Sequence, residues 1–258
     1  MITYDRMPEV REWDGKTYDR ISGPMQALGQ VVLDRLPLSG DETVLDAGCG
    51  SGRITEALIG RLPRGRVIGV DVSASMVAAA RERLGPDADI RRADLLELGH
   101  ELEEPVDAIL STATFHWVAD HAALFRSLHA VLRPGGWLVA QCGGEGNITG
   151  LRGRAGIVME RAPYAEHLRD FRPPWNYANP ADTQSRLLAA GFASAECWLA
   201  PAPTEPGHPR EFLSTIVLGP HVQHLSEPLR EPFMDAVMAE LGEPVVVDYV
   251  RLNIDAIA

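Results

Sequence analysis

The sequence predicts an α/β fold with one substantial core and a mostly parallel sheet. Between about residues 27 and 141, short runs of β-branched and aliphatic residues alternate with stretches of helical periodicity. This alternation is typical of βαβ units, whose strands lie parallel in one sheet. A length of 258 residues with 45% hydrophobic and 23% charged residues fits an ordered globular domain of this class.

Five strands and the helices between them are expected in this first part of the chain. Each strand is a short apolar run, and the helix at Ala74–Leu84 follows Ser73, a residue type that caps helices. The proline and glycines of 134–136 end the helix before the fifth strand. The expected strands are 43–45, 67–70, 90–92, 106–110 and 137–141, and the other two helices are 54–62 and 122–132.

After Gly143 the regular alternation stops. A glycine-rich loop at 143–147 leads into helix-prone and proline-rich pieces as far as Pro180. Order then returns, and apolar and polar residues alternate over 249–257, which predicts a final strand. The other elements expected here are a helix at 184–190, a strand at 195–199, and amphipathic stretches at 211–218 and 231–241.

We therefore expect a single domain over residues 1–258 with three parts. The core covers about 27–145, a substrate cap about 146–190, and C-terminal strands and helices 191–258. The insertion between the fifth strand and the later elements is the expected place for substrate specificity.

Charge and cysteine content exclude several classes of function. A net charge of −12 disfavours nucleic acid and acidic membrane surfaces as partners, because both are bound through basic residues. The three cysteines are far apart, and His208, His221 and His224 lack tight ligand spacing, so we expect neither a disulfide framework nor a metal. The first twenty residues contain no apolar leader and no later run is long enough to span a membrane, which predicts a cytoplasmic protein.

A glycine-rich turn follows the first strand directly. Residues 46–52 read DAGCGSG, and glycines there allow a sharp turn and close approach of a ligand to free helix amides. The second strand ends at Asp71, where a carboxylate can accept hydrogen bonds from both ribose hydroxyls. Arg53 occupies the position where a dinucleotide fingerprint needs a small residue, which argues against a nicotinamide cofactor.

Residues 46–52, Asp71, 93–95 (ADL) and 132–136 (LRPGG) resemble the successive motifs of class I S-adenosylmethionine-dependent methyltransferases. The resemblance covers roughly residues 31 to 141. A weaker similarity, to the trans-aconitate methyltransferase-like group, rests on Trp13-Asp14 with Tyr18, on 115–121 (FHWVADH), on 139–141 (VAQ) and on 251–258.

The resemblance implies a Rossmann-like, doubly wound, mostly parallel seven-stranded sheet with the last strand antiparallel, and a helical insertion as a cap. It implies S-adenosyl-L-methionine as the cofactor. Gly48, Gly50 and Gly52 would line its methionine portion, with Asp46 orienting the loop and the Thr112 and Ala113 carbonyls at the amine. The residues implied for the adenosyl portion are Asp71 at the ribose, Val72, Met76 against the adenine face, Asp94 at the adenine amine and Leu95.

The methyl acceptor is less well defined by the sequence. A carboxylate acceptor is already ionised and would be recognised by arginine or histidine, whereas a hydroxyl would need a base such as His116 or His121. His116 is the candidate catalytic residue, because it follows the fourth strand at the ligand-binding edge of the sheet. The residues considered for the acceptor pocket are His116, Trp117, Trp175 and Tyr177, while Arg152, Arg154 and Arg169 are more typical of solvated surface.

We therefore predict methyl transfer to an oxygen, carboxylate or hydroxyl, of a small molecule, by a monomer or homodimer. An N- or C-methyltransferase is the first alternative. A nicotinamide-dependent oxidoreductase and a non-catalytic protein that binds S-adenosylmethionine or a partner are the others.

Overall fold

The computed structural model describes Trp13, residues 15–102 and residues 104–258, so Asp14 lies outside the described residues. Its centre is a seven-stranded sheet of order β3-β2-β1-β4-β5-β7-β6. All neighbouring pairs from β3 to β5 are parallel, while β7 runs antiparallel to both β5 and β6. The expected fold class is therefore confirmed. The strands are β1 Thr43–Ala47, β2 Arg66–Asp71, β3 Asp89–Arg92, β4 Val106–Thr112, β5 Leu132–Gly143, β6 Ser194–Pro201 and β7 Val250–Ile257.

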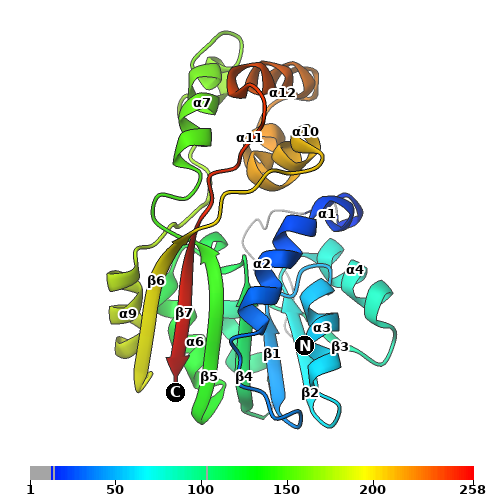
Figure 1. Ribbon diagram of the computed structural model, residues 1–258, viewed down its shortest axis with the longest axis vertical. Coiled ribbons are helices and arrows are strands. Elements are labelled where there is room, and N and C mark those ends of the chain that lie inside the picture. Colours follow the sequence, from blue (N-terminus) through cyan, green and yellow to red (C-terminus); the bar gives the residue numbers. More distant parts are fainter. Residues whose placement is uncertain (1–12, 14, 103) are drawn as a thin grey trace.

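Helices cover both faces of this sheet (Figure 1). On one face α2 (Gly23–Leu33), α3 (Arg53–Arg61) and α4 (Ala74–Leu84) pack on the strands through residues such as Leu33 and Leu58. On the other face α6 (His121–Ala130) and α9 (Pro180–Ala189) enclose a second apolar layer with Leu124 and Phe125. The shorter elements outside the cap are α1 Gly15–Ile21, the 3-10 turns η2 Leu95–Glu97 and η3 Phe115–Trp117, and α5 Leu98–Glu101.

Strand β5 begins earlier than expected. The predicted helix at 122–132 ends as α6 at Ala130, because Leu132 already pairs with Val106 of β4. The turn expected at 134–136 therefore lies inside an irregular strand. Gly135 adopts a φ of +79°, and a side chain at Gly136 would come within 2.9 Å of the Asp107 carbonyl oxygen. The glycines thus let a strand bend where the sequence indicated only a helix stop.

Strand β7 lies between β5 and β6, with both edges hydrogen-bonded. The alternation of polar and apolar residues over 249–257 predicted the strand correctly. It does not show which side chains of the strand face solvent and which are buried. Arg251 and Asn253 are buried, each with 3% of its surface exposed. Arg251 lines the cavity beneath the cap, and Asn253 accepts hydrogen bonds from Arg35 and Gln141. The alternation alone does not reveal these surroundings.

The cap is built from two segments that are distant in sequence. One contains α7 (Thr149–Met159) and α8 (Ala165–Leu168), and the other contains α10 (Pro209–Phe212), the π-helix η4 (Leu213–Val217), α11 (Gly219–His224) and α12 (Glu227–Leu241). They share one apolar cluster that joins residues of α7 to residues of α12. The cap therefore includes helices beyond 146–190, while α9 already packs on β6.

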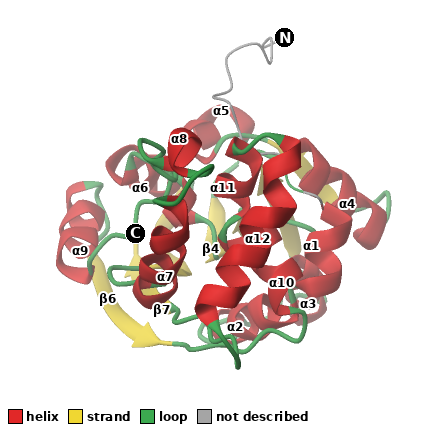
Figure 2. Cartoon of the chain, turned by 90° about the horizontal axis from the view of Figure 1, so that it is seen from above, coloured by secondary structure: helices red, strands yellow, loops and turns green. Residues whose placement is uncertain are grey.

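Figures 1 and 2 show where this cap lies relative to the sheet. Its helices stand over the carboxyl edge of the parallel strands, and α7, α11 and α12 cross above β4 and β7. The strand order reverses between β1 and β4, which is where open α/β sheets bind ligands. None of the described helices combines the length and apolar character needed to cross a membrane.

Candidate functional site

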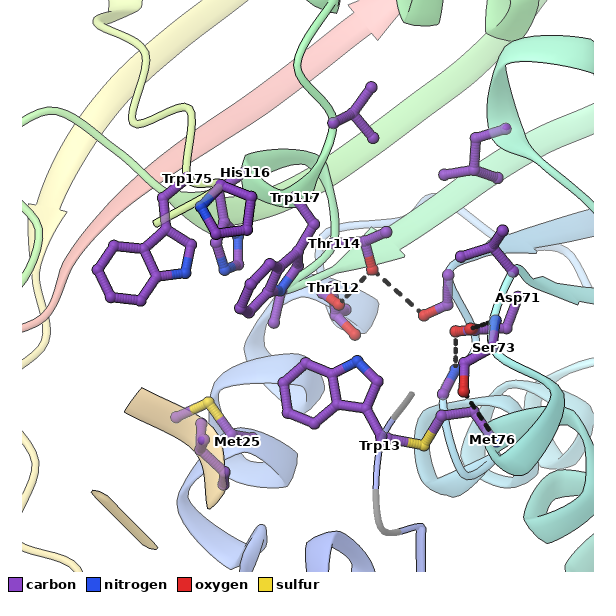
Figure 3. A pocket seen from close by; sticks show the side chains of 18 of the residues that line it. Trp13, Met25, Asp71, Ser73, Met76, Thr112, Thr114, His116, Trp117 and Trp175 are labelled. Carbon is purple, nitrogen blue, oxygen red and sulfur yellow. Dashed lines mark hydrogen bonds between the residues drawn. The ribbon is translucent and has the colours of Figure 1, made fainter. Parts of the chain in front are cut away.

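A cavity of about 530 Å³ lies between the carboxyl edge of the sheet and the cap. Its walls come from the turns after β1, β2, β3 and β4, from α1 and α2, and from the cap. Figure 3 shows Asp71, Ser73 and Met76 at one end and His116, Trp175 and Met25 at the other. The cavity thus has two chemically different ends.

The glycine turn after β1 lines the end of the cavity that contains Asp71. Gly48 and Gly50 line the cavity with φ angles of +85° and +54°. A side chain at Gly48 would collide with Thr114, whose Oγ1 would be 2.2 Å away, whereas one at Gly50 would meet nothing within 4 Å. The space over Gly50 is therefore open to a ligand.

Gly52 differs from the sequence-based expectation, because it lies outside the cavity wall. A side chain there would touch Leu84 and Ala80 at 3.1 and 3.2 Å. Together with its φ of +81°, this assigns Gly52 to the close packing of α3 against α4.

Asp71, the last residue of β2, is hydrogen-bonded to the glycine turn. Its Oδ2 accepts a hydrogen bond from the Gly50 amide at 3.0 Å, and its Oδ1 accepts one from the Ser73 amide at 2.9 Å. Ser73 in turn caps α4 by accepting from the Met76 amide. Carboxylate oxygens have further acceptor sites, so Asp71 can still receive hydroxyl donors from a ligand. Val72 and Met76 line the same end.

Asp94 and Leu95 complete this end after β3. Asp94 lines the cavity and caps η2 by accepting from the Leu96 amide at 2.9 Å. Asp71 and Asp94 make this end acidic, and no arginine or lysine of the described lining residues lies beside them.

Thr112 and Ala113 lie at the end of β4 and also line the cavity. Ala113 adopts a φ of +56°, a left-handed conformation that is costly for a residue with a side chain and frequent at functional sites. The Thr112 carbonyl accepts a hydrogen bond from Thr114 Oγ1 at 3.0 Å, so one of its two acceptor sites is taken. Thr114, which the sequence analysis did not select, thus contacts both this strand end and Gly48.

Asp46 lies under the glycine turn instead of in the cavity wall. It is 1% exposed, and its Oδ2 accepts from Thr55 Oγ1 at 2.7 Å. Its Oδ1 has no hydrogen-bond partner among the described residues. Burial, and then the charge of Asp71, raise the pKa of Asp46 to about 7 despite the Thr55 bond. Asp46 is therefore a group that titrates near neutrality directly below the turn.

His116 reaches the other end of the cavity from η3 and is buried. Its Nδ1 accepts a hydrogen bond from the Gly143 amide at 3.3 Å. In a neutral imidazole the proton is then on Nε2, which makes that nitrogen a donor. Burial, followed by the charge of Arg251, holds the pKa of His116 well below its usual value, so the ring is neutral at physiological pH.

His121 does not lie at the cavity. It is the first residue of α6, and its Nε2 is 2.9 Å from the carbonyl oxygen of Phe115, to which it can only donate. Its Nδ1 is buried without a hydrogen-bond partner among the described residues. The suggestion that His121 could serve as a base is therefore wrong, since its ring is turned into the protein interior.

Arg251 is the functional candidate that sequence reasoning missed. It lines the cavity from β7, is 3% exposed, and donates from Nε to Gln141 Oε1 at 3.3 Å. Burial lowers its pKa most, and the largest opposing contributions come from Cys142, Tyr249, Tyr177 and Tyr18. Its guanidinium lies 5.5 Å from the centre of the Tyr249 ring and forms no ion pair with a carboxylate of the described residues. A buried guanidinium without a counter-ion is costly, so this cavity is suited to an anion.

Aromatic rings form the wall between the two ends and beside His116. Trp117 makes edge contacts with Trp13 at 5.4 Å and with Trp175 at 6.3 Å between ring centroids. Trp175 stacks on Tyr177 at 5.6 Å, and Tyr177 lies 5.8 Å from His116. The structure thus brings together His116, Trp117, Trp175 and Tyr177, as expected.

The three arginines of the insertion are exposed and outside the cavity wall. Arg152 lies over the Trp175 ring at 5.9 Å, beside a second cavity of the cap that Arg169 also lines. Arg154 donates to the carbonyl of Glu240. Within the described part of the chain, no three His, Cys, Asp or Glu side chains are placed to hold a metal ion.

Arg53 has a structural role that explains its presence after the glycines. Its Nε donates to Asp19 of α1 at 2.7 Å, and Nη1 donates to Gln26 of α2 at 2.8 Å. Asp19 also accepts from Ser51 Oγ and from Arg83. These bonds fasten α1, with Tyr18 in the cavity wall, over the glycine turn.

Comparison with known proteins identifies relatives of this chain. A family model described as a methyltransferase domain matches residues 44–136. The chain is 31% identical to a trans-aconitate 2-methyltransferase of Variovorax paradoxus over 240 residues, which cover 93% of this chain and 88% of that protein. It is 40% identical to a protein of the same name from an Azoarcus species over 129 residues, half of each chain.

Solved structures show the same fold. One is a phosphoethanolamine N-methyltransferase of Haemonchus contortus in complex with S-adenosyl-L-methionine. It matches with a TM-score of 0.59 at 19% identity, covering 95% of this chain and 56% of that one. The end of the cavity that holds Gly50 and Asp71 lies where the sequence motifs predicted a cofactor site.

Proposed function

The chain belongs to the class I S-adenosylmethionine-dependent methyltransferases, and we propose that it transfers the methyl group to a carboxylate oxygen of a small organic acid. Its cofactor is S-adenosylmethionine. The atom methylated and the class of acceptor are inferred from the end of the cavity that contains Arg251 and His116.

The glycine and acidic end of the cavity fits the cofactor. The open space over Gly50 can receive the methionine portion, with Gly48 and the carbonyls of Thr112 and Ala113 around it. An acidic lining suits ribose hydroxyls and a positively charged sulfur, whereas a dinucleotide would bring a negative diphosphate to it. We assign Asp71 to the ribose and Val72, Met76, Asp94 and Leu95 to the adenine. When bound, the cofactor supplies a methyl carbon that its positive sulfur activates for direct displacement.

The single observation that carries the acceptor assignment is the buried guanidinium of Arg251, which has no counter-ion among the described residues. A carboxylate placed against it would supply the missing counter-ion and could accept two parallel N–H donors. The same contact would orient the acceptor oxygen, and alignment of acceptor with methyl carbon is the main contribution a protein makes to this displacement. Relatives named for an organic acid support the same acceptor class.

His116 supports a carboxylate over a hydroxyl acceptor. Its Nδ1 lone pair is used by the Gly143 amide, so the nitrogen left for a ligand carries a proton. A donor at this position can bind a carboxylate oxygen but cannot remove a proton from an alcohol or phenol. We therefore assign His116 to acceptor binding and positioning, instead of to general-base catalysis.

Transfer of label from S-adenosylmethionine with a radioactive methyl group tests this proposal. The protein is incubated with a panel of carboxylic acids and, in parallel, with amines and phenols. Methyl esters release labelled methanol in mild alkali, whereas ethers and N- or C-methyl products keep the label. We expect alkali-labile label with carboxylic acids only; alkali-stable label from an amine or phenol would overturn the proposal.

A further inference from the structure

We propose that the acceptor is a monocarboxylic acid with an apolar body, bound with its carboxylate at Arg251 and its body along the aromatic and aliphatic walls of the cap. This inference rests on the proposed function and narrows its substrate class.

The charged side chains that line the cavity include one cation, which can neutralise one carboxylate. Among the described residues that line it, Arg251 is the only arginine or lysine, and the other charged side chains are Asp71, Asp94 and Asp120. A second carboxylate on the acceptor would find no second cation in this lining, since the other polar donors there, such as Asn147, Tyr177 and Tyr249, are neutral. His116 offers one neutral donor, which can share the first carboxylate with Arg251.

The walls beyond Arg251 suit an apolar body. Met25 of α2 lies at the same end of the cavity as His116 and Trp175 (Figure 3). The stacked rings of Trp175 and Tyr177 offer a flat surface on which a ring or extended chain can lie. The aliphatic side chains that the cap adds to this lining are Ile148, Ile216 and Val217.

The π-helix η4 places two of the aliphatic side chains of the cap next to each other in the cavity wall. Successive residues of a wide turn, Ile216 and Val217, both reach the cavity wall. Val217 is almost fully buried, while Ile216 keeps part of its surface accessible. π-Helical turns are rare and occur often at functional sites, which is consistent with a role in specificity.

Arg152 is a second cation close to the apolar end, but it does not line the main cavity. Arg152 lies on the Trp175 ring at 5.9 Å, but it is exposed and lines the second cavity of the cap. Trp175 lines the main cavity and Arg152 does not, so this guanidinium contacts the Trp175 ring without forming part of the wall.

The unmodified protein tests this inference with three acids and labelled S-adenosylmethionine. They are trans-cinnamate and octanoate, with one carboxylate each, and trans-aconitate, with three. We expect kcat/KM for one of the monocarboxylates to exceed that for trans-aconitate by about 100-fold or more, because unpaired carboxylates resist burial. Preference for trans-aconitate would overturn the inference and leave carboxylate methylation intact, whereas alkali-labile label from none of the acids would refute the proposed function itself.

A pair of variants tests the role of the cap wall. Ile216→Ala removes apolar contact from the cavity, whereas Ile157→Ala makes the same change on α7 at a side chain that is 47% exposed and outside the cavity wall. We expect KM for the preferred monocarboxylate to rise about tenfold in Ile216→Ala and to stay unchanged in Ile157→Ala, with KM for S-adenosylmethionine unchanged in both. Equal KM values for the acid in the two variants would contradict the inference.

Discussion

Replacing Asp46 with asparagine should stabilise the protein, and more so as the pH rises. Asp46 is 1% exposed under the glycine turn, and its Oδ1 has no hydrogen-bond partner among the described residues. Burial raises its pKa from 3.8 to about 7 in the folded protein. An asparagine side chain has nearly the same shape, can still accept from Thr55 Oγ1, and has no charge to bury.

The sign of the pH dependence follows from which state binds the proton. Between about pH 4 and pH 7 the folded protein keeps a proton on Asp46 that the unfolded chain releases, so the contribution of Asp46 to the free energy of unfolding falls as pH rises. Each pH unit in this interval is worth about 1.4 kcal/mol. The advantage of Asp46→Asn over the unmodified protein should therefore grow by about 3 kcal/mol between pH 5 and pH 8.5, and then stay constant.

Urea unfolding at pH 5, 7 and 8.5 measures this difference directly. Asp87→Asn, the same change on an exposed aspartate, is the control and should shift stability by less than about 0.5 kcal/mol at every pH. A difference between Asp46→Asn and the unmodified protein that does not change with pH would refute the reasoning, as would a variant that is less stable at pH 8.5.

Two further changes test how the cofactor end is held. Asp71→Ala removes the carboxylate that accepts from the Gly50 and Ser73 amides. The affinity for S-adenosylhomocysteine, measured by calorimetric titration, should therefore fall at least about tenfold. An unchanged affinity would exclude Asp71 from the site. Asp19→Ala removes the carboxylate that accepts from Ser51, Arg53 and Arg83, so the free energy of unfolding should fall by about 1–3 kcal/mol and cofactor affinity should fall with it. Full cofactor affinity in a destabilised Asp19→Ala protein would show that α1 does not help to form the site.

The cofactor end of the cavity could be predicted because its signals are local in sequence. A glycine turn after β1 and an acid at the end of β2 each lie within a few residues of a strand, and parallel strands bring their carboxyl ends to one edge. Asp71, Met76 and Asp94 therefore line the cavity as the sequence indicated. Gly52 has the same residue type and spacing but packs on α4, which only the position of Ala80 and Leu84 reveals.

The acceptor end could not be predicted because it depends on contacts between distant segments. Arg251 alternates with apolar residues like a solvent-facing side chain, and it is buried because β7 inserts between β5 and β6 beneath the cap. The protonation of His116 depends on the Gly143 amide, 27 residues away. The cap wall needs Ile148 and Ile216 together, and these belong to two helical segments separated by α9 and β6.

Arg251→Met tests the central claim most directly, because a substrate-binding role and a structural role predict opposite effects on stability. If the role of the guanidinium is to bind the acceptor carboxylate, replacing it removes a buried charge that has no counter-ion among the described residues. The long bond from Nε to Gln141 and the contact with the Tyr249 ring at 5.5 Å are smaller losses. Arg35→Met is the matched control, since Arg35 is paired with Asp255 and donates to Asn253. Its loss should lower Tm and leave KM for the acid unchanged.

The decisive measurement is Tm of Arg251→Met without ligands, together with its kcat/KM for the preferred acid. We predict a Tm equal to or above that of the unmodified protein and a kcat/KM lower by about 100-fold or more. A lower Tm with unchanged kcat/KM would contradict the account, because Arg251 would then support the fold and not hold the acceptor.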